Sequence, residues 1–171
     1  MPLTDLAPNI ELLLSDVDGV MTDGGITYDE AGLETKTFSV RDGLGVKLWR
    51  RSGGAFGIVT SRSSQVVQRR SDELGVDYIH QGVSEKLPIV RDIAERHGVP
   101  LERVAYLGDD LPDLPVIREV GLGVAVADAA QELLDAAGHV THTRGGRGAV
   151  RELVESLLKA SGKWDQAIEG F

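Results

Sequence analysis

The stretch "IELLLSDVDGVMTDGG", residues 10–25, joins an apolar run to two aspartates and then to a glycine-containing turn. A short apolar run bounded by a turn signal is typical of a buried strand. The run therefore predicts a core strand that delivers the carboxylates of Asp16 and Asp18 to one place. Like charges that lie this close repel each other, and each is costly to desolvate. The stretch predicts that a cation or a reacting group lies beside them.

Outward from this first strand, predicted at residues 10–17, apolar runs alternate with helix-like segments along the chain. Further strands are predicted at residues 55–61, 76–80, 103–110, 121–127 and 139–143, and helices at 42–51, 63–74, 84–97 and 149–162. This alternation is typical of a parallel sheet flanked by helices. We therefore expect one α/β domain over residues 1–171, with a three-layer Rossmann-like fold and a C-terminal tail at about 163–171.

One segment interrupts the alternation. Residues 25–40, "GITYDEAGLETKTFSV", contain two β-prone arms around residues 29–32, which suit a hairpin turn. Because this hairpin directly follows Asp16 and Asp18, we expect it to form a small flap over the carboxyl edge of the sheet. In open α/β sheets, ligands bind at that edge.

Composition limits the partners of the protein. The 171 residues are 42% hydrophobic and 26% charged, with a net charge of −9 and no cysteine. The negative charge disfavours nucleic acid and anionic membranes as partners, but local cations in a cleft still allow a phosphorylated substrate. The sequence shows neither a signal peptide nor an apolar run of about 20 residues that could span a bilayer. The prediction is a cytoplasmic protein without a membrane partner.

Chemically active side chains follow four of the expected strands. They are Asp16 and Asp18 after the first, Thr60 and Arg62 after the second, Lys86 after the third, and Asp109, Asp110 and Asp113 after the fourth. Because the carboxyl ends of parallel strands meet at one edge of the sheet, these side chains are expected to converge on one cleft.

Such a cluster suits phosphoryl transfer. Carboxylates without cysteine or a histidine pair favour a hard cation, and Mg²⁺ fits best because it shares phosphate oxygens with its substrate. Asp16 could attack phosphorus and form an aspartyl-phosphate, while Asp18 transfers protons. Lys86 and the hydroxyl of Thr60 would stabilise the charge on the phosphoryl oxygens.

The motifs "DVDGV", "IVTSR", Lys86 and "GDDLPD" resemble, in order, the four motifs of the haloacid dehalogenase superfamily of phosphatases. Longer stretches, among them "FSVRDGLGVKL" and "GGRGAVRELVE", are similar to the family of 3-deoxy-D-manno-octulosonate 8-phosphate phosphatases. The resemblance covers residues from about 10 to 162. It implies no large cap domain and a Mg²⁺-dependent enzyme that releases phosphate from an eight-carbon keto sugar acid in lipopolysaccharide precursor synthesis.

The resemblance also implies roles for individual residues. Asp16 is the expected nucleophile, and Asp16, Asp18 through its backbone carbonyl, and Asp109 are the expected metal ligands, supported by Asp110 and Asp113. The expected substrate-binding residues are Asp18, Ser39, Val40, Arg41, Asp42, Gly43, Lys47, Arg62, Arg70 and Lys86. The resemblance implies a homotetramer assembled through the hairpin, in which a neighbour's loop of Gly145, Gly146, Arg147 and Gly148 can close the site.

Two positions depart from the family pattern. Thr60-Ser61-Arg62 stands where the family usually has Thr-Gly-Arg, and Lys47 stands where members often have arginine. Lysine retains the positive charge but not the planar two-pronged grip of arginine on a carboxylate. Both departures concern the choice of substrate rather than the chemistry.

Alternative interpretations remain open at this stage. A nine-carbon relative, a nonulosonate 9-phosphate, is the closest rival substrate, and a phospho-receiver signalling domain is a rival of another class. Receivers also gather aspartates, a hydroxyl residue and a lysine on an α/β sheet, although Lys86 precedes "GDDLPD" here, opposite to their order. Taken singly, a D-x-D pair also suits a turn or helix cap, Arg70 a solvated helix face, and the 145–148 loop a flexible link.

Overall fold

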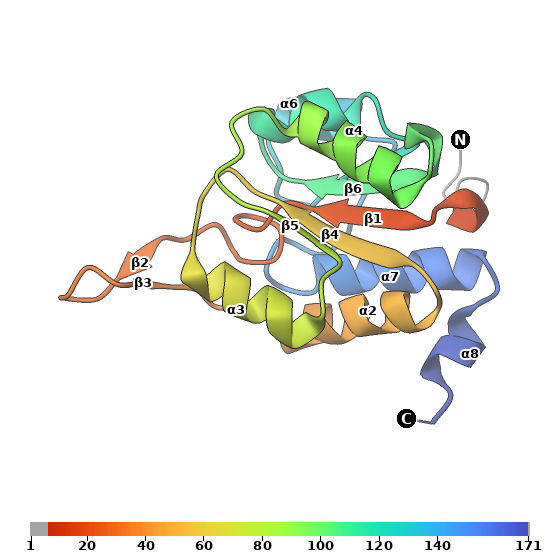
Figure 1. The fold of residues 1–171 in the computed structure, drawn as a ribbon, viewed down its shortest axis with the longest axis horizontal. Helices are drawn as coiled ribbons and strands as arrows, with labels where there is room; N and C mark the ends of the chain where they lie inside the picture. The colour runs from red at the N-terminus through yellow and green to blue at the C-terminus, as the bar shows by residue number, and fades with distance from the viewer. Residues whose placement is uncertain (1–6, 171) are drawn as a thin grey trace.

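Six parallel strands form the central sheet of the computed structural model, which describes residues 7–170 (Figure 1). In spatial order they are β5 (Tyr78–His80), β4 (Ala55–Val59), β1 (Leu12–Ser15), β6 (Val104–Gly108), β7 (Leu122–Ala125) and β8 (His139–Val140). The first strand of the chain is therefore at the centre. Residues 1–6 of the predicted domain and Phe171 of the predicted tail lie outside the described residues.

Helices cover both faces of the sheet, as the alternating pattern predicted (Figure 1). One face carries α2 (Val40–Arg51), α3 (Gln65–Leu74) and α7 (Ala149–Ala160), and the other carries α4 (Lys86–His97), α5 (Leu114–Ile117) and α6 (Gln131–Ala136). Single 3-10 turns lie at η1 (Ala7–Asn9), η2 (Leu101–Arg103) and η3 (Leu111–Asp113). The tail contains a short helix, α8 (Trp164–Ile168), which packs against α2 and α7. The expected three-layer α/β fold is confirmed.

The core is divided by the sheet into two apolar clusters. Leu12 and Leu14 of β1 face α4 and α5, whereas Leu13 faces α2 and α7. Side chains of successive strand residues point to opposite faces, so a strand covered on both sides must be apolar at every position. That requirement explains the uninterrupted apolar run at residues 12–14, which fixes β1 as an interior strand.

The ends of the elements differ from the predicted bounds by a few residues. Helix α2 begins at Val40, two residues earlier than predicted, because the side chain of Ser39 accepts a hydrogen bond from the N–H of Asp42 and caps the helix. Strand β1 ends at Ser15, just before the chain turns at Asp16. Helices α5 and α6 were not predicted, since four and six residues are too short for an apolar stripe.

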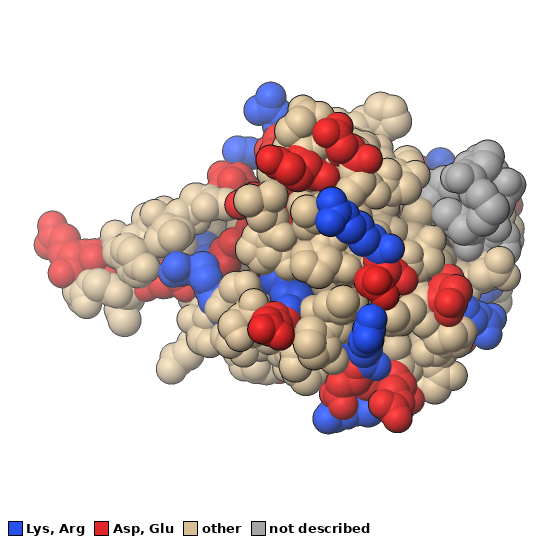
Figure 2. Space-filling model, turned by 90° about the horizontal axis from the view of Figure 1, so that it is seen from above, with Lys and Arg blue, Asp and Glu red and all other residues tan. Residues whose placement is uncertain are grey.

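The insertion after β1 is the predicted hairpin, formed by β2 (Thr27–Tyr28) and β3 (Glu34–Thr35) in antiparallel register. The carboxylate of Asp29 accepts hydrogen bonds from the N–H groups of Ala31 and Leu33, which closes the turn. The hairpin extends outward from the carboxyl edge of the sheet (Figure 1), and Figure 2 shows acidic side chains at its far end. Elsewhere on the face seen in Figure 2, acidic and basic side chains are interspersed.

Over residues 7–170 no helix is both long enough and apolar enough to cross a membrane.

Candidate active site

The site begins with Asp16, the first residue after β1. Its backbone N–H donates to the carbonyl of Leu107 on β6, which holds it at the end of the central strands. Its Oδ1 accepts the N–H of Val17 at 2.6 Å, and its Oδ2 accepts Lys86 Nζ at 2.5 Å. Lys86 is the first residue of α4 and is 2% exposed. The strand end and the helix start therefore place a buried carboxylate and a buried ammonium group in direct contact.

Asp113 connects this pair to the loop after β6. One oxygen, Oδ1, accepts Lys86 Nζ at 2.6 Å and the hydroxyl of Tyr106 at 2.7 Å. The other, Oδ2, accepts the N–H of Asp109 at 3.0 Å. Asp113 is fully buried, and its bonds fix both the ammonium group of Lys86 and the backbone that carries Asp109. Both of its oxygens are thus engaged in hydrogen bonds within the protein.

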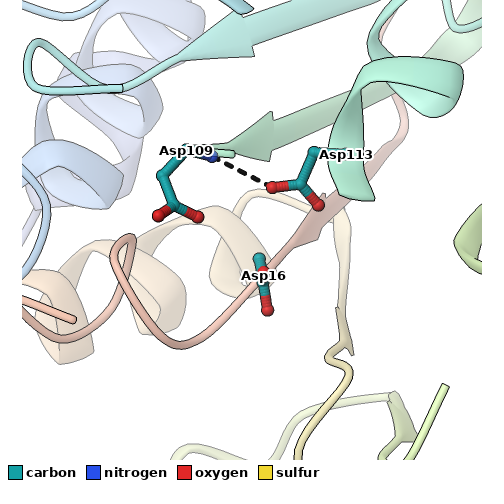
Figure 3. Close-up of side chains that lie close together, drawn as sticks. All are labelled: Asp16, Asp109 and Asp113. Carbon is teal, nitrogen blue, oxygen red and sulfur yellow. Dashed lines mark hydrogen bonds between the residues drawn. The ribbon is translucent and has the colours of Figure 1, made fainter. Parts of the chain in front are cut away.

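Asp109 completes a group of three carboxylates. Asp16, Asp109 and Asp113 each offer an oxygen within 4.8 Å of the others, and Figure 3 shows the three side chains where β1 and β6 end. Gly19 makes room for Asp109, because a Cβ on Gly19 would lie 1.9 Å from Asp109 Oδ2. Gly19 also has a φ of +88°, which disfavours other residues. The turn in "DVDGV" thus requires glycine for both conformation and space.

The electrostatics of this group call for a cation. Burial, followed by the negative charges of Asp113 and Asp16, raises the pKa of Asp109 to about 8. Burial and the charge of Asp113 also raise the pKa of Asp16, against the opposing effect of Lys86. Burial alone would lower the pKa of Lys86, but the charges of Asp113 and Asp16 outweigh it and the pKa is raised. One ammonium group cannot neutralise three carboxylates, and an all-oxygen donor set fits a hard divalent ion such as Mg²⁺.

The carboxylate of Asp18 contacts Lys36 and Arg62, which do not belong to this group. Its Oδ1 accepts a hydrogen bond from Lys36 Nζ, while its Oδ2 lies 3.9 Å from Arg62 Nε. Arg62 in turn donates through Nη2 to Glu34 at 2.8 Å and to the Tyr28 hydroxyl at 3.2 Å. The base of the hairpin therefore holds both the predicted proton-transfer residue and a predicted substrate-binding residue.

Thr60 stands at the other side of β1, directly after β4. It is 2% exposed; its N–H donates to the carbonyl of His80 and its own carbonyl accepts the N–H of Val83. These bonds hold the end of β4 against the segment that leads to Lys86.

The residues expected around the substrate divide into two groups in this chain. Asp42 is buried between α2 and α7, where its Oδ1 accepts the N–H of Arg151 at 2.9 Å, and burial raises its pKa against these hydrogen bonds. Gly43 is also buried, and Arg70 lies over the ring of Phe38 and pairs with Glu73 at 3.2 Å. The contacts just given for Asp42 and Arg70 are thus with α7, Phe38 and Glu73 rather than with the three carboxylates.

The second group is exposed. Val40 is 84% exposed, and Arg41 and Lys47 also face solvent. Arg41 lines a surface hollow together with Arg147 and Arg151. An expected substrate-binding residue thus lies on the same hollow as Arg147, which belongs to the loop expected to close a neighbour's site.

The loop at residues 145–148 is packed in place. The N–H of Gly145 donates to Asp128 Oδ1 at 3.0 Å, and that of Gly146 donates to the carbonyl of Val20 at 2.8 Å. A Cβ on Gly145 would lie 1.7 Å from the carbonyl oxygen of Gly19. The glycines allow the loop to lie against the turn that follows Asp18, where these hydrogen bonds hold it. Arg147 is exposed and lies 3.9 Å from Asp23.

Three contributors were not identified from the sequence. In the sequence, Tyr106 is an ordinary apolar-run residue, Lys36 is a polar residue of a hairpin arm, and Gly19 is a turn residue. Their importance depends on contacts across 7, 18 and more residues of chain, which no local pattern indicates.

Comparison with known proteins first gives the superfamily to which the chain is similar. A family model described as haloacid dehalogenase-like hydrolase matches residues 71–153, which contain Lys86 and the "GDDLPD" loop. The fold agrees: a hydrolase of this superfamily (subfamily III A) from Legionella pneumophila superposes with a TM-score of 0.96 at 42% identity, covering 98% of this chain and 92% of that one.

Curated relatives narrow the class to a family. The chain is 48% identical over 161 residues to the 3-deoxy-D-manno-octulosonate 8-phosphate phosphatase KdsC of Salmonella typhi, covering 94% of this chain and 86% of the relative. The crystal structure of the corresponding phosphatase of Moraxella catarrhalis, in complex with magnesium, phosphate and KDO, is 42% identical with a TM-score of 0.95. The superposition covers 97% of this chain and 95% of that one. The chain belongs to the family of 3-deoxy-D-manno-octulosonate 8-phosphate phosphatases, and the receiver-domain alternative is thereby excluded.

Proposed function

We propose that this chain is a Mg²⁺-dependent cytoplasmic phosphatase that hydrolyses 3-deoxy-D-manno-octulosonate 8-phosphate during lipopolysaccharide precursor synthesis. The observation that carries the proposal is the contact of Asp16 with Lys86 beside Asp109, at the centre of a fold shared with phosphatases of that name. Support for the substrate comes from the relatives named above, including one solved with magnesium, phosphate and KDO.

Mg²⁺ would be held by the carboxylates of Asp16 and Asp109 and the backbone carbonyl of Asp18, and when bound it supplies positive charge to the carboxylates and the phosphate oxygens. The buried, all-oxygen donor set and the raised pKa of Asp109 support this assignment. Asp113 supports the site from behind, through Lys86 and the backbone of Asp109.

The residues of the chain divide the reaction into two displacements. In the first, an oxygen of Asp16 attacks phosphorus, the bond from phosphorus to the sugar oxygen breaks, and Asp18 gives its proton to that oxygen. In the second, Asp18 takes a proton from water, whose oxygen attacks phosphorus. The bond from phosphorus to the Asp16 oxygen breaks, and inorganic phosphate leaves. Lys86 fixes Asp16 and stabilises negative charge on the transferring group, together with Thr60.

We also propose that the functional form is a homotetramer assembled through the hairpin. The hairpin carries apolar side chains that are largely exposed in the single chain, with Ile26 at 51%, Tyr28 at 57% and Leu33 at 65%. Exposed apolar side chains gathered on one projecting element are typical of an interaction surface. Light scattering on the purified protein measures its molar mass and tests this proposal. The mass of a monomer would contradict it.

The substrate is tested by measuring phosphate release with Mg²⁺ from a panel that includes the eight-carbon 8-phosphate and a nonulosonate 9-phosphate. We expect the eight-carbon ester to give the higher kcat/KM. The Asp16→Asn variant, purified and measured in parallel, gives the rate due to contaminating phosphatases, which is subtracted. Comparable or reversed rates for the nine-carbon ester would contradict the assignment. They would point to the departures at Ser61 and Lys47 as the cause.

A further inference from the structure

Lys36 joins the hairpin to the candidate proton-transfer residue. It follows β3, its side chain is only 1% exposed, and its Nζ donates to Asp18 Oδ1. The same Nζ lies 3.3 Å from Glu34 Oε1. A lysine side chain that is this buried in a loop-rich segment is unusual, because an ammonium group is costly to remove from water unless it is paired.

The two oxygens of Asp18 are treated differently by their surroundings. Oδ1 is bound by Lys36, whereas Oδ2 is buried without a hydrogen-bond partner among the described residues. The nearest cationic atom to Oδ2 among the ion pairs of Asp18 is Arg62 Nε, at 3.9 Å. Oδ1 is thus fixed by an ion pair, whereas Oδ2 is available to exchange a proton.

From this geometry, and resting on the function proposed above, we infer that Lys36 is a positioning residue that orients Asp18 for proton transfer. An ion pair to Oδ1 limits rotation of the carboxylate and keeps Oδ2 as the oxygen that exchanges a proton. Proton transfer needs a donor held within hydrogen-bond reach of the reacting atom, so loss of orientation slows the step even when the carboxylate is present.

The hairpin has a second anchor that does not involve Lys36. Arg62 Nη2 binds Glu34 on β3 and the hydroxyl of Tyr28 on β2. Removing the charge of Lys36 therefore leaves the hairpin attached to the segment after β4. This separation allows the orienting role of Lys36 to be distinguished from a merely structural role in holding the hairpin.

The test uses Lys36→Met, which keeps the length of the side chain without its charge, and Glu34→Gln as the matched control. Glu34→Gln weakens the contacts of residue 34 with Lys36 and Arg62 but leaves the ion pair between Lys36 and Asp18. We expect Lys36→Met to lower kcat by about 10- to 100-fold, which is part of the rate enhancement of about 10²- to 10⁴-fold that a general acid–base group supplies. KM should stay within about threefold of wild type. We expect Glu34→Gln to lower kcat by less than about threefold.

A double-mutant cycle with Asp18→Asn decides whether Lys36 acts through Asp18. If it does, Lys36→Met should have almost no further effect on kcat in the Asp18→Asn background. Thermal melting of all four proteins shows whether each variant is folded. An unchanged kcat in Lys36→Met, an equal loss in Glu34→Gln, or the same fold-loss in the Asp18→Asn background would each overturn the inference.

The cycle is measured with whichever phosphate ester the wild type hydrolyses fastest. A wild type that turns over other esters but not the eight-carbon 8-phosphate would contradict the proposed substrate, while the cycle would still test Lys36. Conversely, full turnover of the eight-carbon ester by Lys36→Met would leave the proposed function standing and remove the role of Lys36.

Discussion

Affinity for Mg²⁺ should depend steeply on pH below 8, because the metal must displace a proton from Asp109. Burial beside Asp113 and Asp16 raises the pKa of Asp109 from 3.8 to about 8. With that pKa, about half of Asp109 is ionised at pH 8 and about one part in a hundred at pH 6. The apparent affinity should therefore fall about 50-fold between pH 8 and pH 6, or about 2.3 kcal/mol, and the raised pKa of Asp16 makes the fall steeper.

The stability of the metal-free protein should change in the opposite direction. Between pH 3.8 and about 8 the folded state holds a proton on Asp109 that the unfolded state has released. Stability from this group is thus fully present below pH 3.8 and is lost as pH rises through about 8, by at most about 1.4 kcal/mol per pH unit. The Asp109→Asn variant removes this contribution, so the difference between the two proteins isolates it from groups such as His139, whose pKa burial lowers.

Calorimetric titration of Mg²⁺ into metal-free protein at pH 6, 7 and 8, in buffers of different ionisation enthalpy, measures both affinity and protons released. We expect about one proton per ion from Asp109 at pH 6 and pH 7, with any excess released by Asp16. Urea unfolding in chelator across the same pH range measures the stability. An affinity that changes less than about threefold without proton release would refute the electrostatic reasoning, as would a stability difference from Asp109→Asn that does not vary with pH.

Three substitutions test other parts of the site. Asp16→Asn should reduce phosphate release to below about one thousandth of wild type, since an amide cannot attack phosphorus, and a greater residual rate would contradict nucleophilic catalysis by Asp16. Tyr106→Phe removes a buried hydrogen-bond donor to Asp113 and should lower the free energy of unfolding in urea by about 1–3 kcal/mol. An unchanged urea midpoint would contradict this expectation. Gly19→Ala forces a Cβ onto the carboxylate of Asp109 and a side chain onto a positive φ, so Mg²⁺ affinity by calorimetry should fall at least tenfold; affinity equal to wild type would show that the turn can adapt.

The acidic pair and the lysine illustrate what could be predicted in advance. Asp16 and Lys86 lie 70 residues apart in sequence, yet both follow apolar runs, and parallel strands have only one edge at which their carboxyl ends meet. That rule was enough to predict that they converge on one cleft, and the structure adds the direct contact between them. Asp109 was predicted for the same reason, whereas the inward position of Asp113 depends on the 3-10 turn η3, whose short span has no periodic signal.

The start of α2 shows what the sequence did not indicate. Ser39 and Asp42 are expected at the substrate because of family resemblance, and the structure adds that Ser39 caps α2 and that Asp42 accepts the N–H of Arg151 on α7. No local pattern predicts that second contact, because the two residues are 109 positions apart in the chain.

From the sequence alone it was possible to predict the layered fold, the burial of β1 and the gathering of carboxylates at one edge. The alternation of apolar runs with helical segments indicates a parallel sheet covered on both faces, and its strands all end at the same edge. The tertiary structure alone decided the state of each acidic group. Whether a carboxylate is ionised, fixed or free depends on its distance from other charges and from water: Asp109 lies among like charges, Asp113 is enclosed by donors, and Asp18 is held through one oxygen by Lys36. Those distances arise only when segments far apart in the chain pack together.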